Sequence, residues 1–212
     1  MTGPARPVAV LVGPPGAGKT TIGRKLARRM EVPFLDADHL IEESEGRSIP
    51  DIFASDGEPG FRRIEEQVIG ETLESFNGVL SLGGGAVLSP LTRERLRDLR
   101  VVHLTIGVAE GVRRSRGPGR PLLAGGDATA KYQALLTERS PLYREVAWTT
   151  VTTERRSSGK VVSDIVDRLE SGDPHRRRGG GRRQTHVRRR QTHYAAFCGR
   201  EHSAATTSGS TR

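Results

Sequence analysis

Residues 8–20 read Val8-Ala-Val-Leu-Val12-Gly13-Pro14-Pro15-Gly16-Ala17-Gly18-Lys19-Thr20, an apolar run that ends in a glycine-rich turn. The turn fits the pattern G-x-x-x-x-G-K-[ST]. The apolar run is typical of a buried strand, and the residues from Thr20 to Met30, with Ile22, Leu26 and Ala27 on one face, predict a helix. In this context the backbone N–H groups of the turn surround phosphate oxygens, and the helix directs its positive dipole end at the same anion. The sequence therefore predicts a phosphate-binding loop.

A loop of this kind binds a nucleotide through its backbone and two side chains. We expect Lys19 to bridge the β- and γ-phosphates of ATP and the Thr20 hydroxyl to be a ligand of one Mg²⁺ ion. The loop does not identify the phosphate acceptor, because GTPases, adenylate kinases, small-molecule kinases and motor ATPases share it. The chain lacks the N-K-x-D guanine motif of GTPases and is short for a large motor. The predicted nucleotide-binding residues of the loop are Gly16, Ala17, Gly18, Lys19, Thr20 and Thr21.

Strands and helices alternate along the first 170 residues. Further strands are predicted at 33–35, 78–82, 101–106 and 148–152, and further helices at 63–76 and 161–169. Such alternation is typical of an α/β fold whose parallel sheet is covered by helices on both faces. The prediction is therefore a three-layer α/β/α fold with five parallel strands. Ligands of these sheets bind at the carboxyl ends of the strands.

Two carboxylates, Asp36 and Asp38, follow the second predicted strand. The two-residue period of a strand places both on the same side. One would support the metal through its water shell and the other would face an acceptor hydroxyl. The alternative is a pair of turn-forming aspartates.

Glycines and arginines supply the other candidates. Gly83, Gly84 and Gly85 end the strand at 78–82, where backbone N–H groups meet a ligand without a β-carbon in the way. The loop at 113–123 mixes glycine and proline with four arginines, which fits a hinged lid that carries Arg to a phosphate or, alternatively, a basic surface. Arg62 precedes the helix at 63–76, and its alternative role is a solvated surface residue. The helix that holds Arg139 is expected to end before Pro141.

Composition narrows the class of protein. Cys198 is the only cysteine, so neither a disulfide within the chain nor a cysteine-ligated zinc site is expected. The longest apolar runs, Val8–Val12 and Val101–Ile106, are far shorter than the roughly 20 residues of a membrane helix. The N-terminus lacks the apolar region of a secretory signal. We therefore expect a cytoplasmic protein, and a monomer.

Residues 173–212 differ from the rest of the chain. They hold ten arginines against Asp173 and Glu201, so nearly all of the net charge of +9 belongs to them. Two copies of RRQTH, at 182–186 and 189–193, lie within this segment. Its apolar surface is too small to offset the entropy of ordering it, so we expect a disordered basic tail. The alternative is an arm that binds nucleic acid.

The strings of residues described so far resemble the shikimate kinase family from residue 8 to about residue 169. The resemblance implies a P-loop kinase domain over residues 1–172, with a mobile lid at about 113–125. It also implies Mg²⁺-dependent transfer of the ATP γ-phosphate to the 3-hydroxyl of shikimate, in the biosynthesis of chorismate and the aromatic amino acids. The resembling strings are GPPGAGKTTIGRKLA, FLDADHLIE, GRSIPDIFASDGEPGFRRIEE, VLSLGGGAV, RPLLAG and ERSPLYREVA.

The resemblance also implies roles for individual residues. Lys19 and Arg120 resemble a phosphate-neutralising pair, and Asp38 resembles the residue that holds the accepting hydroxyl and takes its proton. These three are the expected catalytic residues. Shikimate would be held by Asp38, Arg62, Gly83, Gly84, Gly85 and Arg139. Mg²⁺ would be held by Thr20 with the support of Asp36, and the nucleotide would also meet Arg114, Arg120 and Arg156.

Two alternative functions stay open at this point. A gluconate kinase or a related small-acid kinase shares the phosphate loop and an anionic acceptor, although the ordered set of Asp36, Asp38, Gly83–Gly85 and Arg139 favours shikimate. An ATP-sensing adaptor that binds nucleic acid through the basic tail belongs to another class.

Overall fold

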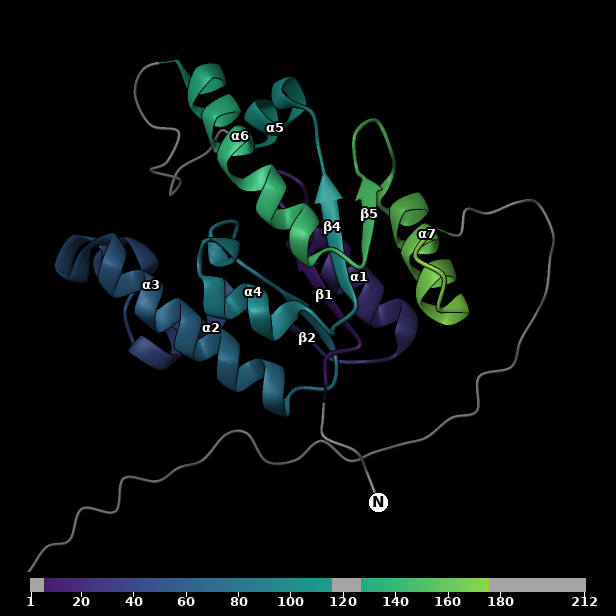
Figure 1. Ribbon diagram of the computed structural model, residues 1–212, viewed down its shortest axis with the longest axis horizontal. Coiled ribbons are helices and arrows are strands. Elements are labelled where there is room, and N and C mark those ends of the chain that lie inside the picture. Colours follow the sequence, from purple (N-terminus) through teal and green to yellow (C-terminus); the bar gives the residue numbers. More distant parts are fainter. Residues whose placement is uncertain (1–5, 116–126, 176–212) are drawn as a thin grey trace, which may run out of the picture. The chain divides into compact units, whose positions relative to one another are not determined.

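Five parallel strands form the sheet in the order β2-β3-β1-β4-β5. The computed structural model describes residues 6–115 and 127–175, which lie in one unit of the chain. The prediction of a five-stranded parallel sheet is confirmed (Figure 1). The strands are β1 (Ala9–Val12), β2 (Phe34–Asp36), β3 (Val79–Ser81), β4 (Val101–Thr105) and β5 (Thr149–Thr152).

Helices connect the strands and cover both faces of the sheet. None of the helices in the described ranges is long and apolar enough to span a membrane. The helices are α1 (Lys19–Met30), α2 (Ala37–Glu45), α3 (Ile49–Ser75), α4 (Pro90–Leu96), α5 (Val108–Ser115), α6 (Ala128–Val146) and α7 (Ser158–Ser171), with a 3₁₀ turn, η1 (Ala86–Leu88).

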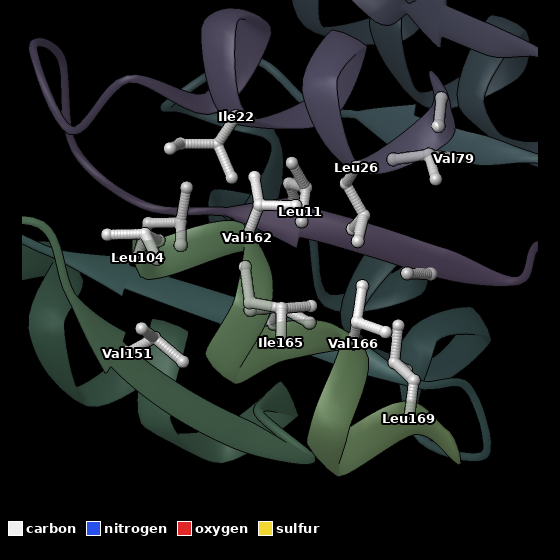
Figure 2. Packing of buried hydrophobic residues seen from close by; sticks show 14 of the residues in the cluster. Leu11, Ile22, Leu26, Val79, Leu104, Val151, Val162, Ile165, Val166 and Leu169 are labelled. Atoms are coloured by element: carbon white, nitrogen blue, oxygen red, sulfur yellow. The ribbon is translucent and has the colours of Figure 1, made fainter. Parts of the chain in front are cut away.

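Helices α1 and α7 cover one face of the sheet with aliphatic side chains (Figure 2). Leu11 of β1 lies between the two helices in a cluster with Leu26 of α1 and Ile165 of α7, and all three are fully buried. Each such side chain contributes about 1.5–3 kcal/mol of burial free energy. This face is therefore a continuous apolar layer.

Helices α3, α4 and α6 cover the opposite face, and Figure 1 shows α6 crossing in front of β1 and β4. Val10 of β1 and Leu80 of β3 pack there against Leu73 of α3 and Tyr143 of α6. Because the alternate residues of β1 point to opposite faces, the strand is apolar throughout. The three-layer arrangement agrees with the prediction.

Helix α3 is longer than the helix predicted at 63–76. It begins at Ile49, and Gly57 interrupts it with φ 68° and ψ 180°, so the element consists of two helical segments. Pro59 lies in the first turn of the second segment, where its missing N–H costs no helical hydrogen bond. Arg62 therefore lies inside a helix and not before one.

Helix α6 runs through Pro141 to Val146, so the prediction that it ends before the proline was wrong. A proline inside a helix costs about 3 kcal/mol. Tyr143 and Val146 lie beyond the proline and are buried, and their burial contributes about 1.5–3 kcal/mol each. Packing of the last helical turn therefore offsets the lost backbone hydrogen bond.

Candidate active site

The loop between β1 and α1 folds back on itself around Lys19. Lys19 Nζ donates to the carbonyl oxygens of Gly13 (2.9 Å) and Pro14 (3.3 Å). Gly16 and Gly18 have φ of 78° and 87°, a left-handed conformation that glycine adopts without strain. The predicted order of strand, glycine-rich loop and helix is confirmed.

Helix α5 packs directly against this phosphate loop. A β-carbon on Gly16 would lie 2.8 Å from the Ser115 hydroxyl, 2.9 Å from the Gly111 carbonyl oxygen and 3.2 Å from the Arg114 β-carbon. Arg114 therefore lies beside the loop, and its Nε pairs with Glu110 at 2.7 Å.

Asp36 connects the phosphate loop to the end of β2. Thr20 Oγ1 donates to Asp36 Oδ2 at 2.7 Å, and the Asp38 N–H donates to Asp36 Oδ1 at 3.2 Å. The predicted geometry was wrong, because the strand ends at Asp36, which caps α2, and Asp38 lies in the first turn of that helix. The Asp36 carboxylate therefore lies against Thr20, whereas the Asp38 carboxylate lies near Gly83.

The oxygens of Thr20 and Asp36 suit Mg²⁺, which prefers oxygen ligands. Mg²⁺ in kinases is held by one or two protein groups together with substrate phosphates and water. A hydroxyl and a carboxylate beside a phosphate loop therefore fit the ion.

Asp38 lies beside the glycine loop that follows β3. A β-carbon on Gly83 would lie 2.8 Å from Asp38 Oδ1 and 2.8 Å from Glu65 Oε1. The surrounding protein raises the pKa of Asp38, as does the charge of Asp36, while Lys19 lowers it. The net effect is a raised pKa, so the Asp38 carboxyl binds a proton more readily than an ordinary aspartate does.

Arg62 reaches the glycine loop from α3. A β-carbon on Gly85 would lie 2.3 Å from Arg62 Nη1, so the guanidinium lies directly against Gly85 and would have to shift if this residue had a side chain. Arg62 pairs with Glu65 (2.6 Å) and Glu58 (3.1 Å). Burial raises the pKa of Glu65, and the charge of Arg62 lowers it.

Arg139 reaches the same loop from α6. It is 7% exposed, and its Nη1 donates to the Gly84 carbonyl oxygen at 3.3 Å. A β-carbon on Gly84 would also lie 3.4 Å from Pro15 Cδ and 3.5 Å from the Gly13 carbonyl oxygen, which is ordinary contact. Two arginines thus meet one glycine loop, and that loop touches the phosphate loop.

The family of the chain follows from comparison with known proteins. Residues 15–170 match the model of the shikimate kinase family. The chain belongs to the shikimate kinase family.

Proteins named shikimate kinase are also similar to this chain over most of their own length. One from Rhodococcus erythropolis is 52% identical over 166 residues, which is 78% of this chain and 98% of the relative. One from Mycobacterium avium is 57% identical over 168 residues, which is 79% of this chain and 96% of the relative. Among solved structures, shikimate kinase from Acinetobacter baumannii in complex with shikimate matches with a TM-score of 0.74 and 40% identity, covering 79% of this chain and 94% of that one. The resemblance stated from the sequence strings is confirmed.

The predicted site residues fall into three groups in this shikimate kinase family member. The structure gathers Lys19, Thr20, Asp36 and Asp38 with the two arginines and the glycine loop. Arg156 instead pairs with Asp164 of α7 at 2.6 Å. Arg120 and residues 116–125 of the predicted lid lie outside the described residues, as does the tail from 176, while residues 113–115 form the last turn of α5.

Three residues that touch the site, Glu65, Tyr132 and Tyr143, have no role in the sequence-based prediction. Glu65 lies one helical turn from Arg62, a spacing that signals an ion pair. Tyr132 donates to the Pro15 carbonyl oxygen (2.7 Å), and Tyr143 donates to that of Gly84 (2.5 Å). Neither tyrosine contact carries a local sequence signal.

Proposed function

We propose that this chain transfers the γ-phosphate of ATP to the 3-hydroxyl of shikimate, giving shikimate 3-phosphate and ADP. The observation that carries the proposal is the convergence of Arg62 and Arg139 on the glycine loop, whose Gly84 touches the phosphate loop. Membership of the shikimate kinase family and the relatives of that name support it.

The nucleotide half of the site holds and neutralises the phosphates. The backbone N–H groups of Gly16, Ala17 and Gly18 surround the phosphate oxygens at the start of α1. Lys19, held above the loop by the Gly13 and Pro14 carbonyl oxygens, places a positive charge where negative charge builds up. Arg114 lies beside the loop, and Arg120 and Arg156 complete the predicted nucleotide contacts.

The acceptor half holds a planar carboxylate and presents a hydroxyl. Two guanidinium groups suit a carboxylate because each donates paired hydrogen bonds to it. The glycine loop adds backbone N–H groups without the obstruction of a side chain. Arg62 and Arg139 therefore fix the ring so that its 3-hydroxyl faces Asp38.

The chemical step moves one phosphoryl group and one proton. The 3-hydroxyl oxygen forms a bond to the γ-phosphorus, and the bond from that phosphorus to the β–γ bridging oxygen breaks. The hydroxyl proton passes to Asp38, whose raised pKa suits a proton acceptor. The reaction thus needs mainly positioning and charge neutralisation from the protein.

Mg²⁺ would be held by the Thr20 hydroxyl, with Asp36 fixing that hydroxyl through the 2.7 Å hydrogen bond. When bound, the ion neutralises the β- and γ-phosphate oxygens. A monomeric state, a cytoplasmic location and nucleic-acid binding limited to the basic tail stay predictions of the sequence.

A coupled assay of ADP release tests the function. With ATP and excess Mg²⁺, we expect ADP release to depend on shikimate, with shikimate 3-phosphate identified by mass spectrometry. Gluconate at the same concentration should release no more ADP than ATP alone. If gluconate released ADP as fast as shikimate or faster, the assignment of shikimate as the acceptor would be overturned.

A further inference from the structure

Helix α6 carries two buried tyrosines that reach the two loops of the site. Tyr132 and Tyr143 are both 0% exposed and lie eleven residues apart, which is about three helical turns, so they share one face of the helix. Tyr132 donates to the Pro15 carbonyl oxygen at 2.7 Å, and Tyr143 donates to the Gly84 carbonyl oxygen at 2.5 Å. One helix thus contacts both loops.

The contact of Tyr132 fixes the direction of a phosphate-binding group. The Pro15 carbonyl and the Gly16 N–H belong to one peptide plane, and among the described residues no peptide bond is cis. In a trans peptide the carbonyl and the N–H point in opposite directions. Holding the Pro15 oxygen towards α6 therefore turns the Gly16 N–H away from the helix. Because glycine rotates freely about its own backbone bonds, this plane needs an external anchor.

The contact of Tyr143 acts in the same way on the glycine loop. The Gly84 carbonyl shares a peptide plane with the Gly85 N–H, and it also accepts a hydrogen bond from Arg139. Tyr143 therefore sets both the Gly85 N–H and the carbonyl that orients the arginine.

The two hydroxyls are permanent donors. Burial raises the pKa of Tyr132 to about 12 and raises that of Tyr143 above the ordinary value. Both stay protonated over the working range of a kinase assay. Losing the Tyr132 hydroxyl would leave the partly buried Pro15 carbonyl oxygen without that donor, whereas the Gly84 carbonyl oxygen would lose Tyr143 but keep its hydrogen bond from Arg139.

We propose that Tyr132 and Tyr143 are positioning residues, and that each supports the binding of a different substrate. Tyr132 orients the phosphate loop for the nucleotide, and Tyr143 orients the glycine loop for the acceptor. The assignment of the acceptor rests on the proposed function, whereas the nucleotide role of Tyr132 is measurable by binding.

The Tyr132→Phe and Tyr143→Phe variants serve as controls for each other. We expect Tyr132→Phe to raise the Kd of ADP and the KM of ATP about 2- to 10-fold, with the KM of shikimate within about twofold of wild type. We expect Tyr143→Phe to raise the KM of shikimate by a similar factor and to leave the Kd of ADP within about twofold. The proposal would be overturned if each variant changed the constants for nucleotide and shikimate by the same factor. It would also be overturned if a variant only lowered the Tm and changed neither set of constants selectively.

Gly111→Ala offers an independent approach that keeps both tyrosines. A β-carbon at Gly111 would lie 2.2 Å from the Tyr132 hydroxyl oxygen and 2.3 Å from its Cζ, so it displaces the hydroxyl from Pro15. Gly159→Ala on α7 is the matched control, because its β-carbon would meet nothing within 4 Å. We expect weaker ADP binding, about 2- to 10-fold, for Gly111→Ala only.

Different results would overturn the proposed function and the proposed role of Tyr132. If the wild-type protein releases no ADP in the presence of shikimate, the proposed function is overturned, and the ADP titrations still decide the role of Tyr132. If the wild-type protein is active but Tyr132→Phe and Gly111→Ala bind ADP as wild type does, the role of Tyr132 is overturned.

Discussion

Arg62 donates a 2.6 Å hydrogen bond to Glu65, a carboxylate that lies one helical turn away and is only 3% exposed. The same guanidinium lies against Gly85, and within the described residues its buried Nε has no hydrogen-bond partner. Glu65 therefore fixes one edge of Arg62 and leaves donors for an anion at the glycine loop.

Arg62→Ala should raise the KM of shikimate about 10- to 100-fold, because a charge-assisted hydrogen bond contributes roughly 1.5–3 kcal/mol. The KM of ATP should stay within about twofold. Arg63→Ala is the control, since Arg63 is exposed on the same helix and should change neither constant. Steady-state kinetics with each substrate varied check this, and an unchanged KM of shikimate for Arg62→Ala would remove Arg62 from the acceptor site.

Asp38→Asn should lower kcat at least about 100-fold, because the amide takes no proton from the accepting hydroxyl. The Kd of ADP, measured by calorimetry, should stay within about twofold of wild type. An unchanged kcat would exclude Asp38 from the chemical step.

Thr20→Val removes the proposed metal ligand and the hydrogen bond to Asp36 while keeping the shape of the side chain. We expect the Mg²⁺ concentration for half-maximal activity to rise about tenfold or more. Thr20→Ser keeps the hydroxyl and should stay near wild type. If valine and serine gave the same Mg²⁺ titration, the hydroxyl would hold no metal.

His103 should make the fold sensitive to acid. It lies in β4, stacks on Tyr143 with ring centroids 5.1 Å apart, and is 4% exposed. Burial, together with the smaller effect of the positive charge of Arg144, lowers its pKa to about 4. The unfolded chain therefore binds more protons between about pH 6.5 and pH 4, so stability is complete above this window and falls as the pH decreases through it.

The linkage relation gives a loss of about 2 kcal/mol at pH 5 relative to pH 7.5 from this group. His103→Phe should remove that part of the loss, and urea unfolding of both proteins at both pH values measures it. The comparison between pH values cancels any change in packing. An identical loss in both proteins would contradict the explanation.

The folded part of the chain extends past residue 172. Thr149 Oγ1 donates to the Pro174 carbonyl oxygen at 2.5 Å, and Arg168 Nη1 donates to Thr149 Oγ1 at 2.5 Å. A protein ending at residue 175 should therefore keep the Tm and kcat of the full chain. One ending at 172 should unfold about 2–4 °C lower, since it lacks the Pro174 carbonyl.

The same truncation at 175 tests the basic tail. If the tail binds nucleic acid, the full chain should bind it with a steep dependence on salt and the truncated protein should not. Equal binding by both proteins would place any such site in residues 1–175.

The phosphate loop could be predicted because its backbone conformation depends on glycines that are adjacent in the sequence. Arg62, Arg139 and Gly84 could be named through the resemblance, but their contacts join α3, α6 and the end of β3. Tyr132 could not be predicted, because its partner Pro15 lies 117 residues away and nothing local marks the pair. The geometry of Asp36 and Asp38 was missed because helix α2 begins directly after Asp36, at the point where an extended backbone was expected to continue.

The central place of β1 in the sheet has a consequence for hydrogen–deuterium exchange. β1 is hydrogen-bonded to β3 on one side and to β4 on the other, whereas β2 is a three-residue edge strand bonded only to β3. The amides of Val10 and Leu11 should exchange only when the whole sheet opens, and those of β2 through local opening. We therefore expect the phosphate loop to follow the slowest-exchanging backbone of the sheet, and Asp38 to follow a strand that opens at a smaller free energy.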